Sequence, residues 1–224
     1  MRRPHPIQRI PRVPRDCVWE ITGACNLRCV HCANRSAELH PRELTLDQLL
    51  RVAESLARLG CHVVKVTGGE PLLRPDWDRF CRGLADLGLN VALITNGLLL
   101  DDEALDRALV AGVGHVAISL DGLRDVHDGI RLRPGQGPSP WEAAVEALRR
   151  TVPRVRTTVI TQVNLRNLRQ LPDLRALLAG LDVTRWQLQL AVPTGRVREL
   201  AEPFLIRPED LEELTSFIAC AVRE

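Results

Sequence analysis

Lysine is almost absent from this chain of 224 residues: Lys65 is the only one among 30 lysine and arginine residues, so arginine carries nearly all the positive charge. The net charge is only +2, and no long basic block interleaved with aromatic residues occurs, which argues against a nucleic-acid partner. No stretch approaches the roughly 20 apolar residues that span a bilayer. The first residues, MRRPHP, lack the apolar segment of a secretory signal. We therefore expect a cytoplasmic protein with no membrane partner.

The composition otherwise fits one globular domain, with 45% hydrophobic and 26% charged residues. Residues 1–16 are rich in proline and arginine and cannot form a core of their own, so we predict a flexible arm there and a single domain over residues 17–224. The last helical pattern reaches Glu224 without a clear stop signal, which is compatible with a missing carboxyl-terminal portion.

Short apolar runs alternate with helical patterns along this domain. The predicted strands are 17–22, 63–67, 91–95, 115–120, 156–162 and 186–192. The predicted helices are 46–57, 75–87, 101–111, 140–150, 165–181 and 208–222. Strands that alternate with helices predict a parallel sheet with right-handed crossovers. Because the chain is too short for the about 250 residues of a complete eight-unit barrel, we predict an α/β fold with an open, partial TIM-type barrel of six β/α units.

Three cysteines, Cys25, Cys29 and Cys32, occur on one short segment. Three thiolates on one tight loop can hold iron and leave one coordination position empty, whereas an ordinary electron-transfer cluster has four cysteine ligands and a different spacing. A zinc site would require a second Cys-x-x-Cys pair or paired histidines. A disulfide is disfavoured because cytosolic cysteine clusters more often bind metal or catalyse.

Further motifs follow the predicted strands: Gly68-Gly69-Glu70-Pro71 after the second, Ser119-Leu120-Asp121-Gly122 after the fourth, and then His127-Asp128-Gly129-Ile130-Arg131. Together with the cysteine spacing they resemble the radical S-adenosylmethionine (radical SAM) superfamily. The resemblance implies a 4Fe-4S cluster on the three cysteines, with S-adenosylmethionine bound to the fourth iron. One electron then cleaves this cofactor to methionine and a 5′-deoxyadenosyl radical. His31 stands where the family usually has an aromatic residue, and residues 26–31 would wrap the cluster.

By this resemblance the cluster ligands are Cys25, Cys29 and Cys32. The implied cofactor-binding residues are Gly68, Gly69, Glu70, Pro71, Ser119, Asp121, Arg131, Asn164 and Val192. Simpler interpretations stay open for four of these: Asp121 and Asn164 can cap helices, Arg131 can be a solvated surface charge, and Val192 precedes an ordinary Pro-Thr-Gly turn. We interpret Thr95-Asn96-Gly97 as a plain turn, with a cofactor-facing role as the less favoured alternative.

Strand parity predicts which side chains line the barrel interior. Apolar residues alternate with Gln187 and Gln189 on the sixth strand, so the two glutamines point inward, and Glu20, Lys65 and Thr67 can do so likewise. For Lys65 we expect an interior ion pair with a nearby acid. The other cysteines are expected to be small buried apolar residues: Cys17, Cys61, Cys81 and Cys220.

The sequence leaves two classes of substrate as candidates. Residues 127–141 resemble peptide maturases, which places a ribosomally made peptide first; residues 67–74 are equally typical of haem-like or molybdenum cofactor biosynthesis, which places a small molecule second. A peptide substrate would call for a separate recognition protein, and the family requires an electron donor such as flavodoxin or ferredoxin. The cysteine-rich extension of many peptide-modifying relatives does not follow Val192. An alternative of another class is a non-catalytic iron-sulfur carrier or sensor.

Overall fold

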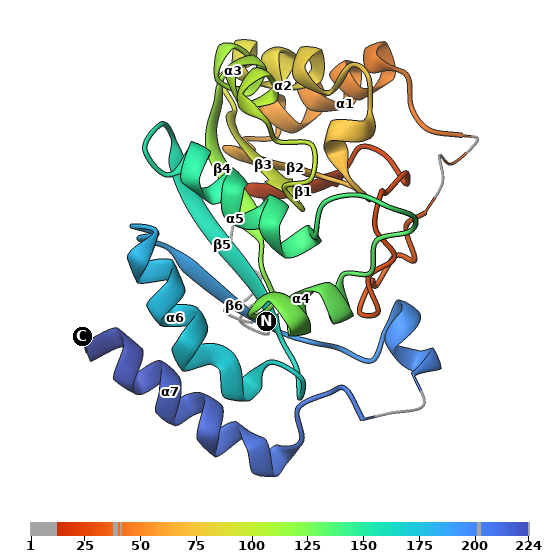
Figure 1. Ribbon diagram of the computed structural model, residues 1–224. Helices are drawn as coiled ribbons and strands as arrows, with labels where there is room; N and C mark the ends of the chain where they lie inside the picture. The colour runs from red at the N-terminus through yellow and green to blue at the C-terminus, as the bar shows by residue number, and fades with distance from the viewer. Residues whose placement is uncertain (1–12, 38–39, 41, 201–202, 224) are drawn as a thin grey trace, which may run out of the picture.

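The computed structural model describes residues 13–37, 40, 42–200 and 203–223. A curved sheet runs through the molecule, with helices packed along its outer side (Figure 1). The strands are β1 (Asp16–Glu20), β2 (Val63–Thr67), β3 (Asn90–Thr95), β4 (Val113–Ser119), β5 (Arg156–Val163) and β6 (Trp186–Leu190). The α-helices are α1 (Leu46–Arg58), α2 (Trp77–Asp86), α3 (Asp102–Val110), α4 (Arg124–Ile130), α5 (Pro140–Thr151), α6 (Leu171–Gly180) and α7 (Leu211–Arg223). Short 3-10 helices are η2 (Pro71–Leu73), η3 (Leu168–Gln170), η4 (Gly195–Glu199) and η5 (Pro208–Asp210).

The six strands form one parallel sheet in the order β1-β2-β3-β4-β5-β6. Each strand therefore lies beside its neighbour in the sequence. β1 and β6 pair with one strand each in this sheet, so the sheet curls without closing. The predicted α/β fold with an open, partial TIM-type barrel of six units is confirmed, and the carboxyl ends of all strands meet at one edge, where such folds carry their sites.

Alternation along each strand separates the core from the lumen. On β2, Val64 and Val66 are fully buried against the helices, whereas Lys65 and Thr67 face the concave side of the sheet. The core also contains an edge-to-face aromatic pair, Trp19 with Phe80, whose ring centroids lie 5.1 Å apart. The curved sheet is thus apolar outside and more polar inside.

The helix predicted over residues 165–181 is wrong at its start, since α6 begins only at Leu171, after η3. Two asparagine side chains hold the preceding backbone in a turn: Asn167 Oδ1 accepts from Asn164 N at 2.8 Å, and Asn164 Oδ1 accepts from Arg166 N at 3.0 Å. Such local hydrogen bonds compete with helix formation. The sequence pattern also missed α4, a short helix that contains Gly129, a poor helix former.

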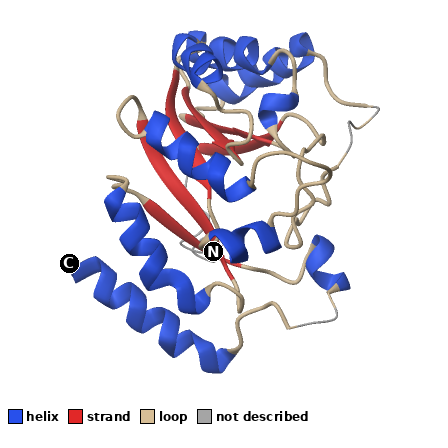
Figure 2. Cartoon of the chain, viewed as in Figure 1, coloured by secondary structure: helices blue, strands red, loops and turns tan. Residues whose placement is uncertain are grey.

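The last two helices, α6 and α7, lie side by side at the β6 end of the sheet (Figure 2). Leu214 of α7 packs with Leu171 of α6, and Phe217 of α7 meets Trp186 of β6 edge-to-face at 5.8 Å. Among the described residues no helix is long and apolar enough to cross a membrane.

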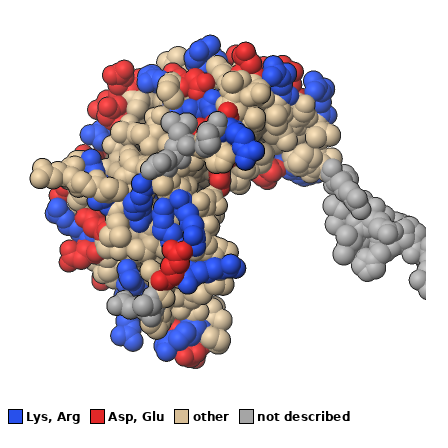
Figure 3. Space-filling view, turned by 90° about the vertical axis from the view of Figure 1, so that its right-hand side faces the viewer, with Lys and Arg blue, Asp and Glu red and all other residues tan. Residues whose placement is uncertain are grey.

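Most of the predicted flexible arm, residues 1–12, lies outside the described residues, while Asp16 already belongs to β1. Of the four cysteines expected to be buried, Cys61 and Cys81 are buried, Cys17 is half-buried and Cys220 is exposed. The expectation is therefore wrong for Cys220, which lies on the last helix. Basic and acidic side chains are both spread over the face seen in Figure 3, in keeping with the small net charge.

Candidate active site

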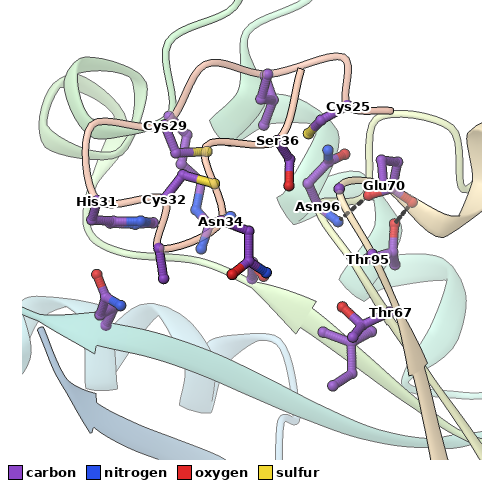
Figure 4. A pocket seen from close by; sticks show the side chains of 18 of the residues that line it. Cys25, Cys29, His31, Cys32, Asn34, Ser36, Thr67, Glu70, Thr95 and Asn96 are labelled. Atoms are coloured by element: carbon purple, nitrogen blue, oxygen red, sulfur yellow. Dashed lines mark hydrogen bonds between the residues drawn. The ribbon is translucent and has the colours of Figure 1, made fainter. Parts of the chain in front are cut away.

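The three clustered cysteines lie on the loop that follows β1. All are free thiols: Cys29 is buried, while Cys25 and Cys32 are half-buried. They line one cavity of about 310 Å³ at the carboxyl edge of the sheet, and their sulfur atoms turn toward the same space (Figure 4). Among the described residues, no three His, Cys, Asp or Glu side chains converge tightly enough for a single metal ion. A multi-iron cluster requires its cysteine ligands to lie further apart, because each thiolate binds a different iron. Three thiols around one cavity fit that requirement.

Burial changes the acidity of two of these thiols. It raises the pKa of Cys29 to about 11, although the nearby Arg131 guanidinium acts in the opposite direction. Burial also raises the pKa of Cys25. Because the thiolate is the metal ligand, binding iron must displace protons from these groups.

Backbone hydrogen bonds tie the cysteine loop to three other segments. After β2, Glu70 N donates to Ala24 O at 2.8 Å. At the end of α4, the carbonyl of Ile130 accepts from Val30 N at 2.9 Å. After β6, Arg196 N donates to Cys32 O at 3.1 Å. The loop is therefore held by elements spread across the whole sheet.

The side chain of Arg196 adds two further hydrogen bonds to the cysteine loop. Its Nη1 donates to Cys29 O at 3.1 Å and its Nη2 to Ser36 O at 2.8 Å, so one guanidinium bridges two points of the loop. The preceding Gly195 has φ +55°, and a Cβ there would lie 2.1 Å from Cys32 O. The sequence analysis did not predict a role for Arg196. Its position directly after the turn that ends β6 was the one feature that could have pointed to the site.

The two glycines after β2 have a structural role in addition to the predicted one. A Cβ on Gly68 would lie 2.6 Å from Thr22 O, and a Cβ on Gly69 would lie 2.2 Å from Ala24 O. Glycine is thus required so that the chain's own cysteine loop can approach, not only to admit a ligand. Both glycines do line the cavity.

Glu70 is buried beside these glycines and points into the same cavity (Figure 4). Its carboxylate accepts hydrogen bonds from Thr95 Oγ1 at 2.8 Å, Asn96 N at 2.9 Å and Leu72 N at 3.3 Å. Burial raises the pKa of Glu70 to about 7, although these donors favour the ionised form. The segment Thr95–Asn96, interpreted from sequence as a plain turn, therefore holds a site residue.

Asn96 also reaches the cysteine loop, because its Nδ2 donates to Asn26 Oδ1 at 2.8 Å. It lines the cavity together with Thr95. The position of Asn96 at the carboxyl end of β3 was the signal that could have identified it, since strand ends carry the sites of this architecture.

Asp121 lies fully buried behind the cavity wall. Its Oδ2 accepts from Arg131 Nε at 2.6 Å and lies 2.7 Å from His31 Nε2, while its Oδ1 accepts from Gln162 N at 2.8 Å. Burial alone would raise the pKa of Asp121, but Arg131 and His31 outweigh it and hold the pKa well below its usual range. Asp121 N donates to His127 Nδ1 at 3.0 Å, and burial lowers the pKa of His127 to about 3. The network links the cysteine loop to β4, α4 and β5.

The remaining residues predicted to bind the cofactor divide into those that line the cavity and those that do not. Ser119 and Arg131 line the cavity. Pro71 starts η2 and is buried, and Asn164 is fully buried in the turn before η3. Val192 is 49% exposed, and none of these last three lines the cavity.

The predicted lumen residues are confirmed. Glu20 and Gln189 line the cysteine cavity, and Lys65, Thr67 and Gln187 line a second cavity on the concave face. The expected ion pair of Lys65 exists, with Asp16 at 3.6 Å, but the two side chains are 41% and 59% exposed. The pair is thus exposed, not interior.

Comparison with known proteins agrees with this geometry. The model of the Radical SAM superfamily matches residues 19–178, a span from β1 into α6. The chain belongs to the radical SAM superfamily. Members of this superfamily use a 4Fe-4S cluster and S-adenosylmethionine, and the three thiols on the loop after β1 fit that cluster.

Two relatives of this radical SAM chain differ in their named reactions. It is 36% identical to the AdoMet-dependent heme synthase of Methanosarcina barkeri, over 90% of the chain and 56% of that protein. It is 32% identical to the mycofactocin maturase MftC of Mycobacterium tuberculosis, over 80% of the chain and 45% of that protein. The chain spans about half the length of these curated relatives.

Solved structures show the same radical SAM fold. Streptococcus suis SuiB bound to S-adenosylmethionine superposes with a TM-score of 0.76 at 15% identity, over 94% of the chain and 48% of SuiB. SuiB bound to its precursor peptide SuiA gives a TM-score of 0.77 at 16% identity, over 94% of the chain and 46% of SuiB.

Proposed function

We propose that this chain cleaves S-adenosylmethionine reductively and abstracts a hydrogen atom from a substrate held over the lumen of the half-barrel. When bound, the 4Fe-4S cluster and S-adenosylmethionine supply an electron and a 5′-deoxyadenosyl radical. The observation that carries this proposal is the convergence of three free thiols and a buried carboxylate, Glu70, on one cavity at the strand ends.

The residues of this chain would act by holding and orienting the two cofactors. Cys25, Cys29 and Cys32 would ligate three irons. Glu70 would accept from the ammonium group of S-adenosylmethionine, because its carboxylate is already fixed by three donors and faces the cavity.

Arg131 would pair with the carboxylate of S-adenosylmethionine. Its Nε is used by Asp121, and its side chain lines the cavity, so the rest of the guanidinium is available to a ligand. Ser119 would offer its hydroxyl to the polar part of the same cofactor. Asp121 would act as a positioning residue, because it touches Arg131 and does not line the cavity.

For the substrate, we place a small molecule ahead of a ribosomally made peptide. The named haem synthase is more similar to the chain than the named maturase, at 36% against 32% identity, and the match covers more of the chain. A peptide remains the second candidate, supported by the maturase and by SuiB in complex with its precursor peptide. A short precursor-peptide reading frame beside the gene would favour the peptide and would speak for a separate recognition protein.

A strongly reducing donor of the flavodoxin or ferredoxin class would supply the electron. We place the reaction in the cytoplasm, because a reducing compartment keeps the cysteines as thiols. The alternative is a non-catalytic iron-sulfur carrier, which would load a cluster and leave S-adenosylmethionine intact.

Anaerobic reconstitution tests the proposal against this carrier. Cluster-loaded protein is incubated with S-adenosylmethionine and dithionite, and 5′-deoxyadenosine and methionine are quantified, with a reaction lacking dithionite as the control. We expect both products to form only with the reductant. Loaded protein that yields neither product would overturn the proposal and support the carrier.

A further inference from the structure

A second cavity, of about 360 Å³, continues the cysteine cavity down the concave face of the sheet. We call it the lumen cavity. The residues that line both cavities are His31, Thr67, Ile94, Ser119, Arg131, Gln162 and Gln189. The two therefore share a wall, and a substrate in the lumen cavity would lie next to the space that faces the three thiols.

Strand register places a lysine and a histidine on either side of an alanine in this cavity. Lys65 on β2 pairs with Ala92 on β3, and Ala92 pairs with His115 on β4. All three line the lumen cavity. Two strand spacings separate Lys65 from His115, about 10 Å. The methyl group of Ala92 leaves the space between the two longer side chains open.

Basic residues line the lumen cavity, although Asp121 behind its wall pairs with Arg131 and His31. Its lining includes Lys65, Arg131 and two histidines, and no Asp or Glu of the described residues is among the lining side chains. Lys65 is also the only lysine among the chain's 30 basic residues. Its partner Asp16 is 3.6 Å away and 59% exposed, so the pair is long and solvated and holds the ammonium weakly.

The neighbouring polar groups are arranged to accept a ligand beside Lys65. His115 Nε2 lies 2.8 Å from Thr158 Oγ1, which fixes the ring in the cavity wall. Gln187 and Gln189 line the same cavity from β6. A cation flanked by neutral hydrogen-bonding groups in a cavity without acids matches an anionic group of a ligand.

We propose that Lys65, with His115 across Ala92, binds a carboxylate of the substrate at the bottom of the lumen cavity. This inference rests on the proposed function and specifies its substrate class. Lys65 lies two residues before the end of β2, about 7 Å below it. A carboxylate held there would fix which part of the substrate faces the cysteine loop. The carboxylate can belong to a small molecule or to an acidic side chain of a peptide.

The single lysine allows a direct test that needs no turnover. Cluster-loaded wild-type protein is acetylated anaerobically with an amine-selective reagent, and acetylation of Lys65 and of the amino terminus is followed by mass spectrometry. The small-molecule probe is the tetracarboxylate coproporphyrin III, with its tetramethyl ester as the uncharged match. The peptide probe is a glutamate-containing decapeptide, with the glutamine version as the match.

We expect one carboxylate probe, at about ten times its dissociation constant, to slow acetylation of Lys65 about tenfold, because only the free fraction reacts. The amino terminus and the uncharged matches should show no such effect. Whichever probe protects identifies the source of the carboxylate. If neither protects, or if an uncharged match protects equally, the inference is overturned.

Variants then test the charge itself. Lys65→Gln should weaken binding of the protecting probe about tenfold or more, and Lys65→Arg should restore most of it. Arg154→Gln, at an exposed basic residue on the outer surface, is the matched control and should leave binding unchanged. Equal binding by Lys65→Gln and wild type would overturn the inference. The proposed function is judged separately, by release of 5′-deoxyadenosine from the wild-type protein.

Discussion

Replacement of Asp121 by asparagine isolates the buried network behind the cavity. The carboxylate is fully buried and receives Arg131 Nε at 2.6 Å, His31 Nε2 at 2.7 Å and Gln162 N at 2.8 Å. The Asp121→Asn substitution would keep the shape of the side chain and remove its negative charge, leaving the Arg131 guanidinium without its counter-ion. Removing one partner of a buried ion pair typically costs about 3–5 kcal/mol of unfolding free energy.

Urea unfolding of the cluster-free protein at pH 7 measures this cost. The matched control is Asp106→Asn, which breaks the Asp106–Arg154 pair on the surface, where Asp106 is 63% exposed. Exposed pairs contribute about 0–1 kcal/mol. We expect Asp121→Asn to lower the unfolding free energy by several times the effect of Asp106→Asn. Equal effects of the two substitutions would refute the reasoning that the network is buried and charged.

Three further predictions concern the cysteine loop and the network behind it. Gly69→Ala should sharply lower the iron bound per chain after reconstitution, since its Cβ would lie 2.2 Å from Ala24 O, whereas Gly114→Ala, with open space around it, should load normally; equal loading would contradict this. Arg196→Ala should also lower iron loading and broaden the cluster's electron paramagnetic resonance signal, because two hydrogen bonds to the loop are lost; an unchanged signal would count against that role. The fold lowers the pKa of His127 from 6.5 to about 3. Between these two pH values the histidine is protonated in the unfolded chain but neutral in the folded protein. The free energy of unfolding therefore falls as the pH drops from about 6.5 to about 3, by up to about 5 kcal/mol. His127→Asn should flatten this acid slope in urea unfolding, and an unaltered slope would show that another group causes it.

The strand and helix alternation was predictable because it depends on local patterns. Each predicted strand overlaps an observed one, and β2 agrees at both ends, since Val63–Thr67 alternates cleanly between core and lumen. The cysteine loop and the Gly-Gly-Glu segment were also readable, because they are short motifs at strand ends. Helix boundaries failed where side-chain hydrogen bonds of Asn164 and Asn167 override the helical pattern.

Long-range partners were not predictable from the sequence. Asp121 meets His31 across 90 positions of the chain, and Arg196 meets Cys29 across 167. Nothing local distinguishes Arg196 from the many other arginines. The prediction for the glycine pair named ligand approach alone, because the sequence does not show that the cysteine loop also packs against Gly69. Such contacts depend on how the strand ends assemble in space.

The most direct test of the central claim is the iron content and product release of single cysteine variants. Cys25→Ala, Cys29→Ala and Cys32→Ala are each reconstituted anaerobically beside Cys81→Ala, whose cysteine is buried in α2, away from the loop. The account predicts that each loop variant loses the cluster and releases no 5′-deoxyadenosine, while Cys81→Ala retains both. Full iron and full product release in any of the three loop variants would contradict it.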